Sequence, residues 1–236
     1  MMVSLRIYPL HVGTITRQIT GFCHGLEPDI VDLPLICWYI EGSDKRILVD
    51  TGGGDPARVD PKRRPYRRDD DQTPENALKK IGVSCQDIDI VVLTHLHWDH
   101  SAGSELFPKA KILVQSEELR LADRLVTPSC TGNVPENVDF TVISGDAQVG
   151  RGVRVIVTPG HTHGLQGVLV DGQTGPIFIA SDTLPLFKNV ESSPFTISDI
   201  YVDIEQYYES LHKIAQLSAF ILPGHDSRVF ERTAYY

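Results

Sequence analysis

Most of the nine histidines in the sequence follow short apolar runs, at places where a β-strand would end. The most informative stretch, residues 90–103, runs from Ile-Val-Val-Leu-Thr into His-Leu-His-Trp-Asp-His. Residues i and i+2 of an extended segment point to the same side, so His95 and His97 can present two imidazoles to one metal ion. This spacing predicts a metal site rather than surface histidines that meet by coincidence.

Asp99 and His100 follow where the chain turns, and a helix is predicted through residues 104–107. These two side chains would face the other side of the same pocket. Imidazole nitrogens combined with a carboxylate oxygen suit zinc or a similar first-row ion. The complete motif therefore predicts a pocket built to bind such ions.

Three further apolar runs end in a residue of the same kind. They are residues 155–162 with His161, 177–182 with Asp182, and 220–226 with His225. A single histidine after a strand is usually a packed turn residue, but four strand ends that all carry ligand-type residues are not explained that way. In α/β folds, sites are built at the carboxyl ends of strands, where these residues would meet.

The predicted elements alternate between strands and helices. Strands are predicted at residues 3–8, 35–40, 46–49, 88–93, 111–114, 153–158, 167–170, 176–180 and 220–222. Several of them are apolar at every position, which predicts strands covered on both faces by helices. One helix is predicted at 73–82, and a last long helix opens at Asp203 and carries a core-facing stripe. The stripe consists of Ile204, Tyr207, Tyr208, Leu211, Ile214 and Ala215.

Length and composition predict one globular α/β domain that spans residues 1–236. Hydrophobic residues make up 41% of the chain and charged residues 22%, which is typical of a globular protein. The net charge of −9 argues against a nucleic-acid partner, because binding to a phosphate backbone needs clustered positive charge.

The sequence also predicts a cytoplasmic protein with no membrane partner. The first residues do not form a signal peptide, and the longest apolar run, 35–40, is far shorter than the roughly 20 residues that span a bilayer. The four cysteines are widely spaced without a Cys-x-x-Cys pair, which is typical of reduced thiols.

Taken together, these residues resemble the metallo-β-lactamase superfamily, whose fold is a four-layer αββα sandwich. The resemblance covers nearly the whole chain and is closest to the N-acyl-homoserine lactonase-like metallohydrolases. Its landmarks occur in the order of the family, at residues 48–52, 94–100, 159–162, 181–182 and 223–226.

The resemblance implies a ligand for each of seven positions. One zinc ion would be held by His95, His97 and His161, a second by Asp99, His100 and His225, and Asp182 would bridge the two. Asp50 matches the structural aspartate of the family, which orients the ligands.

The implied function is a dinuclear zinc hydrolase that opens a lactone, with an N-acyl-homoserine lactone or related ester as substrate, as in quorum quenching. A hydroxide that bridges two ions about 3.5–4 Å apart would attack the carbonyl carbon. One zinc ion would polarise the carbonyl oxygen while the other stabilises the departing alkoxide. Asp99 is the candidate catalytic residue that helps to move the proton.

Other branches of the fold remain as alternatives. A glyoxalase II-like thioesterase would carry a helical domain after His225, where the sequence has room for only a short segment. A persulfide-dioxygenase-like oxidoreductase shares much of the first motif but binds a single iron ion. A non-catalytic metal-binding protein would not need the complete ligand set.

The residues that contact substrate are less well defined. The related lactonases place a tyrosine three residues after the bridging aspartate, where this sequence has Pro185, and Tyr39, Tyr66 and Tyr201 are the candidates to replace it. Candidates for the pocket wall are Trp98, Phe187, Phe195 and His163, the last of which is alternatively a hydrogen-bonded turn residue. The loop at 54–72 reads as a solvated loop or a lid. That loop and the tyrosine-rich ending are candidate contacts for a homodimer.

Overall fold

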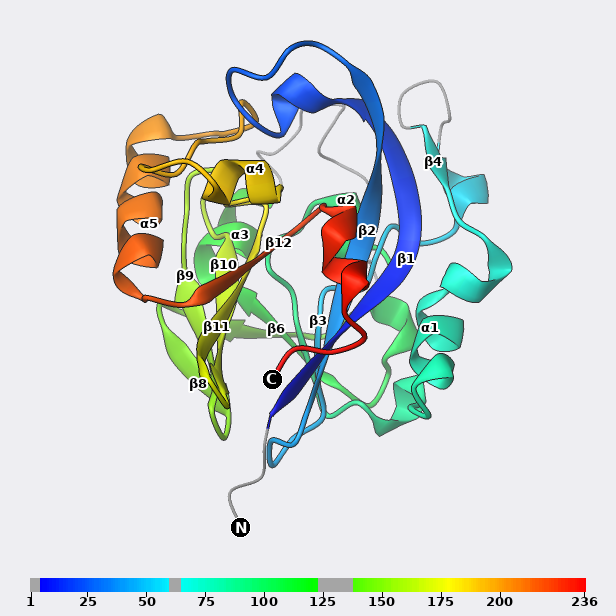
Figure 1. Ribbon diagram of the computed structural model, residues 1–236. Helices are drawn as coiled ribbons and strands as arrows, with labels where there is room; N and C mark the ends of the chain where they lie inside the picture. Colours follow the sequence, from blue (N-terminus) through cyan, green and yellow to red (C-terminus); the bar gives the residue numbers. More distant parts are fainter. Residues whose placement is uncertain (1–4, 60–64, 123–137) are drawn as a thin grey trace.

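Two β-sheets packed face to face form the centre of the computed structural model, which describes residues 5–59, 65–122 and 138–236 (Figure 1). The first sheet has seven strands in the order β4-β1-β2-β3-β5-β6-β7. These are β1 (Arg6–Gln18), β2 (Ile30–Glu41), β3 (Ile47–Val49), β4 (Tyr66–Arg67), β5 (Ile90–Val92), β6 (Lys111–Gln115) and β7 (Phe140–Ile143).

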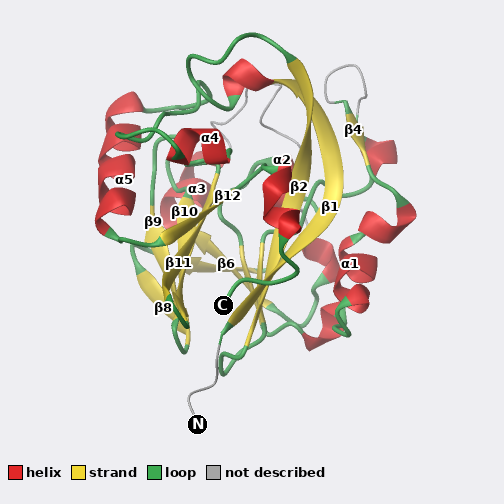
Figure 2. Ribbon diagram, viewed as in Figure 1, coloured by secondary structure: helices red, strands yellow, loops and turns green. Residues whose placement is uncertain are grey.

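The second sheet has five strands in the order β12-β11-β10-β9-β8. They are β8 (Ala147–Gly150), β9 (Val153–Val157), β10 (Gln166–Gly172), β11 (Gly175–Ser181) and β12 (Phe220–Pro223). Helices cover the outer face of each sheet, as Figure 2 shows. The helices of the described residues are α1 (Pro74–Lys80), α2 (Trp98–Ser101), α3 (Ser116–Ala122), α4 (Phe187–Val190) and α5 (Ile204–Gln216), of which α1 and α5 lie on the outer faces of the first and the second sheet. The expected αββα sandwich is confirmed.

Each interface between layers has its own hydrophobic cluster. Ala77 and Leu78 of α1 belong to the cluster on the outer face of the first sheet. Tyr207, Leu211 and Ile214 of α5 belong to the cluster on the outer face of the second. A third cluster fills the space between the sheets, with Trp38 and Ile179 among its members.

Residues 35–40 of strand β2 show why this run is apolar at every position. Leu35 and Tyr39 face the helix layer, whereas Trp38 and Ile40 face the other sheet. The prediction that such strands have helices on both faces is therefore wrong. Because side chains alternate between the faces of a strand, a run that is apolar at every position must have both faces buried. The sequence does not determine whether a helix or a second sheet covers each face.

The direction of the strands brings five strand ends to the same edge of the sandwich. β3 and β5 run parallel in the first sheet, and β11 and β12 run parallel in the second. β9 and β11 both pair antiparallel with β10, so they too point the same way. The segments that follow these strands contain the predicted ligands.

Some predicted elements differ from the structure. The segment at 104–107 is a single 3-10 turn, Ser104–Leu106, preceded by the short helix α2. Tyr208 and Ala215 of the predicted stripe lie on the exposed side of α5. Part of the 54–72 loop forms β4, which pairs with β1, while residues 60–64 lie outside the described residues.

The burial of the cysteines and the length of the helices complete the description of the fold. Cys23, Cys37 and Cys85 are free and buried, and Cys130 lies outside the described residues. None of the helices in the described part of the chain combines the length and the apolar character that crossing a bilayer requires.

Candidate metal centre

Unusual backbone conformations turn the chain directly after two of the strands. Asp50 follows β3 with a φ of 61°, and Ser181, the last residue of β11, has a φ of 48°. Residues other than glycine are rare in this left-handed region, and such strain is common at functional sites. These turns aim the side chains of Asp50 and Asp182 into the same buried space.

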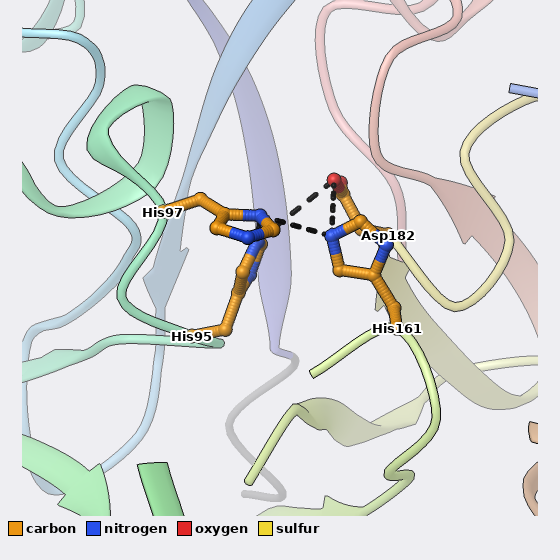
Figure 3. Close-up of side chains that lie close together, drawn as sticks. All are labelled: His95, His97, His161 and Asp182. Atoms are coloured by element: carbon orange, nitrogen blue, oxygen red, sulfur yellow. Dashed lines mark hydrogen bonds and ion pairs between the residues drawn. The ribbon is translucent and has the colours of Figure 1, made fainter. Parts of the chain in front are cut away.

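Four ligand-type side chains from both sheets form a first cluster, shown in Figure 3. It consists of His95, His97, His161 and Asp182, whose ligand-type atoms all lie within 4.8 Å of one another. All four residues are buried. The loop after β5 supplies two of the histidines, and the ends of β9 and β11 supply the other two residues.

Asp99, His100 and His225 form a second cluster within the same distance limit. Asp182 lies between the clusters. Its Oδ2 is 3.2 Å from Nε2 of His161, while its Oδ1 is 3.3 Å from Nε2 of His100 and 3.0 Å from Nε2 of His225. The two oxygens of this carboxylate therefore face different clusters, which is the arrangement that bridging two cations requires.

Hydrogen bonds on the far side of the imidazole rings fix their orientation. Nδ1 of His161 donates to the carbonyl oxygen of Ile200 at 2.8 Å, and Nδ1 of His225 donates to that of Pro34 at 2.9 Å. Nδ1 of His100 lies 2.8 Å from Oδ2 of Asp50. These contacts leave each Nε2 directed at the centre, where its deprotonated form can bind a metal ion.

The donor atoms fit a pair of divalent cations. Nε2 of His100, Oδ1 of Asp182 and Nε2 of His225 are buried without a hydrogen-bond partner among the described residues. Buried polar atoms are normally paired, and a cation held among these three would satisfy all of them. A mixed set of imidazole nitrogens and carboxylate oxygens suits zinc and similar first-row ions.

The electrostatics of the first cluster keep His95 and His97 neutral. Burial and the neighbouring imidazoles lower the pKa of His95 well below its usual value, and burial lowers the pKa of His97 to about 3. A neutral imidazole is the form that binds a metal ion. These histidines are therefore ready to accept a cation at neutral pH.

Unlike His95 and His97, the side chains of His100 and Asp182 are stabilised in their charged forms. Burial opposes a charge on His100, but the carboxylates of Asp182, Asp50 and Asp99 outweigh it and raise the pKa of His100 well above its usual value. Burial also opposes a charge on Asp182, yet His225, His100 and His161 hold the pKa of Asp182 well below its usual value. A cation that binds here must displace the proton of His100, so its binding weakens as the pH falls.

Asp50 connects one ligand to the backbone of another ligand loop. Its carboxylate accepts hydrogen bonds from N of Thr94 at 2.8 Å and from Oγ1 of Thr94 at 2.9 Å, in addition to the contact with His100. Thr94 directly precedes His95 in the chain. Asp50 therefore contacts one predicted ligand and the backbone next to another, and its role in orienting them stays a prediction.

Replacing Asp50 with asparagine is expected to lower kcat/KM roughly 10–100-fold, the usual cost of losing a group that orients metal ligands. Asparagine keeps the shape but replaces one acceptor oxygen with an NH₂ group, so one of the contacts to Thr94 and His100 is lost. Steady-state kinetics with metal-loaded protein measures the effect. An exposed control, Asp89→Asn, should leave kcat/KM unchanged, and equal rates for Asp50→Asn and the wild type would contradict the expectation.

The other predicted site residues have varied surroundings. Trp98 is buried and its ring packs edge-on against that of Tyr66, with 5.2 Å between the ring centroids. Phe187 lies under the guanidinium group of Arg228, and Phe195 packs against the cluster on the outer face of the second sheet. None of these three aromatic residues belongs to the two ligand clusters.

His163 also lies outside the two clusters. It lines a cavity of about 610 Å³ together with Glu117, Arg120, Glu209 and neighbouring residues of α3 and α5. Its role as a substrate contact remains a prediction.

The three candidate tyrosines differ in location. Tyr39 lies in the core of the first sheet, and Tyr201 is exposed on the surface. Tyr66 is partly buried in β4, and its hydroxyl donates to the carbonyl oxygen of Gly54. Pro185, at the position of the family tyrosine, accepts a hydrogen bond from N of His225.

Two residues that support the centre are missed by sequence reasoning. Tyr207 of α5 is buried, and its hydroxyl donates to the carbonyl oxygens of Asp182 and Thr183. Glu118 of α3 is buried and accepts hydrogen bonds from both ligand loops of the first cluster. Each residue lies on a helix distant in sequence from its partners, so no local motif marks it.

Comparison with known proteins identifies the family. The profile of the metallo-beta-lactamase superfamily matches residues 36–225. An N-acyl homoserine lactonase from Bacillus sp. is 28% identical over 238 residues, which cover 95% of this chain and 94% of that one. A solved N-acyl homoserine lactone hydrolase, with N-hexanoyl-L-homoserine at its catalytic metal centre, has a TM-score of 0.82 at 24% identity over 98% of this chain and 96% of that one. Another solved quorum-quenching N-acyl homoserine lactone hydrolase has a TM-score of 0.81 at 25% identity, covering 97% and 95%. The chain therefore belongs to the metallo-β-lactamase superfamily.

Proposed function

We propose that this protein is a dinuclear zinc hydrolase that opens the ring of N-acyl-homoserine lactones. The observation that carries the proposal is the carboxylate of Asp182, whose oxygens face two separate clusters of ligand-type side chains. The relative that is 28% identical over 95% of this chain acts on the same class of lactone, as its name states. Quorum quenching would be the biological consequence.

Seven side chains would hold the two ions. His95, His97 and His161 would bind one, Asp99, His100 and His225 the other, and Asp182 both. Zinc is proposed because histidine nitrogens predominate in the donor set, while hard cations such as magnesium prefer oxygen ligands. When bound, two such ions polarise a carbonyl oxygen and lower the pKa of water enough to supply a nucleophile at neutral pH.

Asp99 is the proposed proton carrier. Its side chain is 13% exposed, whereas the side chains of His100 and Asp182 are 4% and 8% exposed. The Asp99 carboxylate is therefore the ligand-type group of these three that a substrate and its leaving alkoxide reach most easily. It would accept a proton from the attacking water and deliver it to the alkoxide oxygen.

An apolar cavity beside the centre would receive the acyl chain. It has a volume of about 380 Å³ and reaches His225. Its apolar lining consists of Ile19, Leu26, Val31, Leu33, Pro34 and Leu186. Polar groups that include Asp32 and Lys188 also line it. An acyl chain with a polar lactone head fits such a combination of surfaces.

The alternatives within the superfamily are not favoured. A mononuclear iron oxidoreductase would need a single set of ligands, but the described side chains offer two sets joined by Asp182. A glyoxalase II-like thioesterase is not favoured, because the relative that matches 95% of this chain is a lactonase by name.

A substrate screen with zinc-loaded protein tests the proposal. We expect N-acyl-homoserine lactones to be hydrolysed faster than thioesters or phosphodiesters. We also expect KM to fall by up to about fourfold for each methylene that enters the apolar cavity, since each buried methylene contributes about 0.8 kcal/mol. Initial rates for a series of acyl-chain lengths measure both effects.

The His97→Ala protein, which lacks a ligand of the first cluster, is the inactive control for this screen. A strong preference for thioesters would contradict the proposed substrate. Full lactonase activity of His97→Ala after metal depletion would contradict the metal mechanism itself.

A further inference from the structure

We propose that Glu118 is a positioning residue that sets the geometry, and with it the metal affinity, of the first cluster but not of the second. The inference rests on the proposed metal centre and concerns a residue outside the predicted ligand set. Glu118 lies in α3, on the segment that follows β6, and is not adjacent in sequence to any of the seven ligands.

The carboxyl group of Glu118 joins the two loops that supply the histidines of the first cluster. Oε1 accepts a hydrogen bond from N of Leu96 at 2.9 Å, and Leu96 is the residue between His95 and His97. Oε2 accepts from Oγ1 of Thr162 at 2.7 Å, and Thr162 directly follows His161. One side chain therefore fixes the backbone on both sides of the cluster.

A third hydrogen bond and close packing make the connection rigid. Oε2 also accepts from N of Gly164 at 3.0 Å. A Cβ atom at Gly164 would lie only 2.8 Å from Cα of Glu118, so the loop approaches α3 as closely as its backbone allows. Glu118 is 1% exposed, which leaves water little access to replace these bonds.

The second cluster is held by other contacts. His100 is oriented by Asp50 and His225 by the carbonyl oxygen of Pro34. Neither contact involves Glu118 or α3. The loss of Glu118 should therefore loosen the first cluster while the orienting contacts of His100 and His225 remain.

Glutamine is a discriminating replacement at this position. The partners of Glu118 are all donors: two backbone N–H groups and the hydroxyl of Thr162. A glutamine side chain has one acceptor oxygen, and its NH₂ group would face an N–H or O–H donor on the other side. Glu118→Gln therefore keeps the volume of the side chain but disconnects one of the two loops from α3.

The test measures metal affinity rather than activity. Cobalt(II) is titrated into metal-free wild-type and Glu118→Gln protein in competition with a chelating dye, and the cobalt absorption band reports the ligand geometry. We expect one of the two affinities to fall roughly 10–100-fold while the other stays within about threefold of the wild type. In a His225→Ala background, which retains the first cluster, the same fall should persist.

Glu117→Gln is the matched control, because Glu117 is the adjacent exposed residue and pairs with Arg120. It should leave both affinities unchanged. Wild-type affinities and spectrum in Glu118→Gln would overturn the inference, and so would an equal fall in both affinities. If Glu118→Gln does not fold, the same titration is carried out with Thr162→Val. A fall in only one of its two cobalt affinities supports the inference, and unchanged affinities overturn it.

This test separates the inference from the proposed function. A wild-type protein that binds two ions but opens no lactone would refute the proposed substrate, and the affinities would still decide the role of Glu118. A wild-type protein that binds no cobalt would refute both.

Discussion

Replacing Asp182 with asparagine is expected to lower kcat/KM for lactone hydrolysis on the order of 1,000-fold, which corresponds to about 4 kcal/mol. Asp182 presents one oxygen to each cluster, with Oδ2 3.2 Å from His161 and Oδ1 3.0 Å from His225. Asparagine keeps a single ligand oxygen, so one cluster loses the oxygen that Asp182 supplies and the two sites are no longer bridged. Kinetics and metal content per chain, measured on the same preparations, record both effects.

Asp171→Asn is a suitable control, because Asp171 lies in β10 of the same sheet and is exposed. It should match the wild type in rate and in metal content. An Asp182→Asn protein that binds two ions and hydrolyses lactones at the wild-type rate would show that the carboxylate has no bridging role.

Removal of the ions with a chelator is expected to abolish hydrolysis and to lower Tm by roughly 8–16 °C for each ion. This expected shift assumes free metal at about 1,000 times Kd, where binding stabilises the fold by about 4 kcal/mol. It also assumes that Tm changes by about 2–4 °C for each kcal/mol of stability in a chain of this size. Without cations, the buried Nε2 atoms of His100 and His225 have no hydrogen-bond partner among the described residues. Thermal unfolding followed by circular dichroism, before and after chelation, measures the shift.

Addition of zinc should restore both Tm and activity to the chelated protein. Identical unfolding curves for treated and untreated protein would contradict the expectation that the ions stabilise this fold.

The convergence of the ligands is predictable from sequence because short-range rules govern it. The i, i+2 spacing directs the side chains of His95 and His97 to the same side. Three further residues follow apolar runs, which places them at strand ends: His161, Asp182 and His225. The structure brings these residues together at the edge where β5, β9, β11 and β12 end.

The supporting contacts are not predictable in the same way. Glu118 and Tyr207 reach the ligand loops from helices that pack there only after the sandwich forms. Their residue types are ordinary for a helix, and the tyrosine reads as a member of a core-facing stripe. Such roles depend on tertiary packing, which periodicity does not encode.

Apolar runs alone do not determine the order of the layers either. The strand that contains Leu35 and Trp38 must bury both faces, and its sequence is equally compatible with helices on both sides. The resemblance to the family, rather than the periodicity, led to the correct αββα order.

The proposed ligands are divided between the two sheets, since His97 and His100 follow a strand of the first and His161, Asp182 and His225 follow strands of the second. Bound ions would therefore act as a cross-link between the halves of the sandwich. The two sheets could not separate without releasing metal. The resistance of the folded chain to cellular proteases would therefore depend on the supply of that metal.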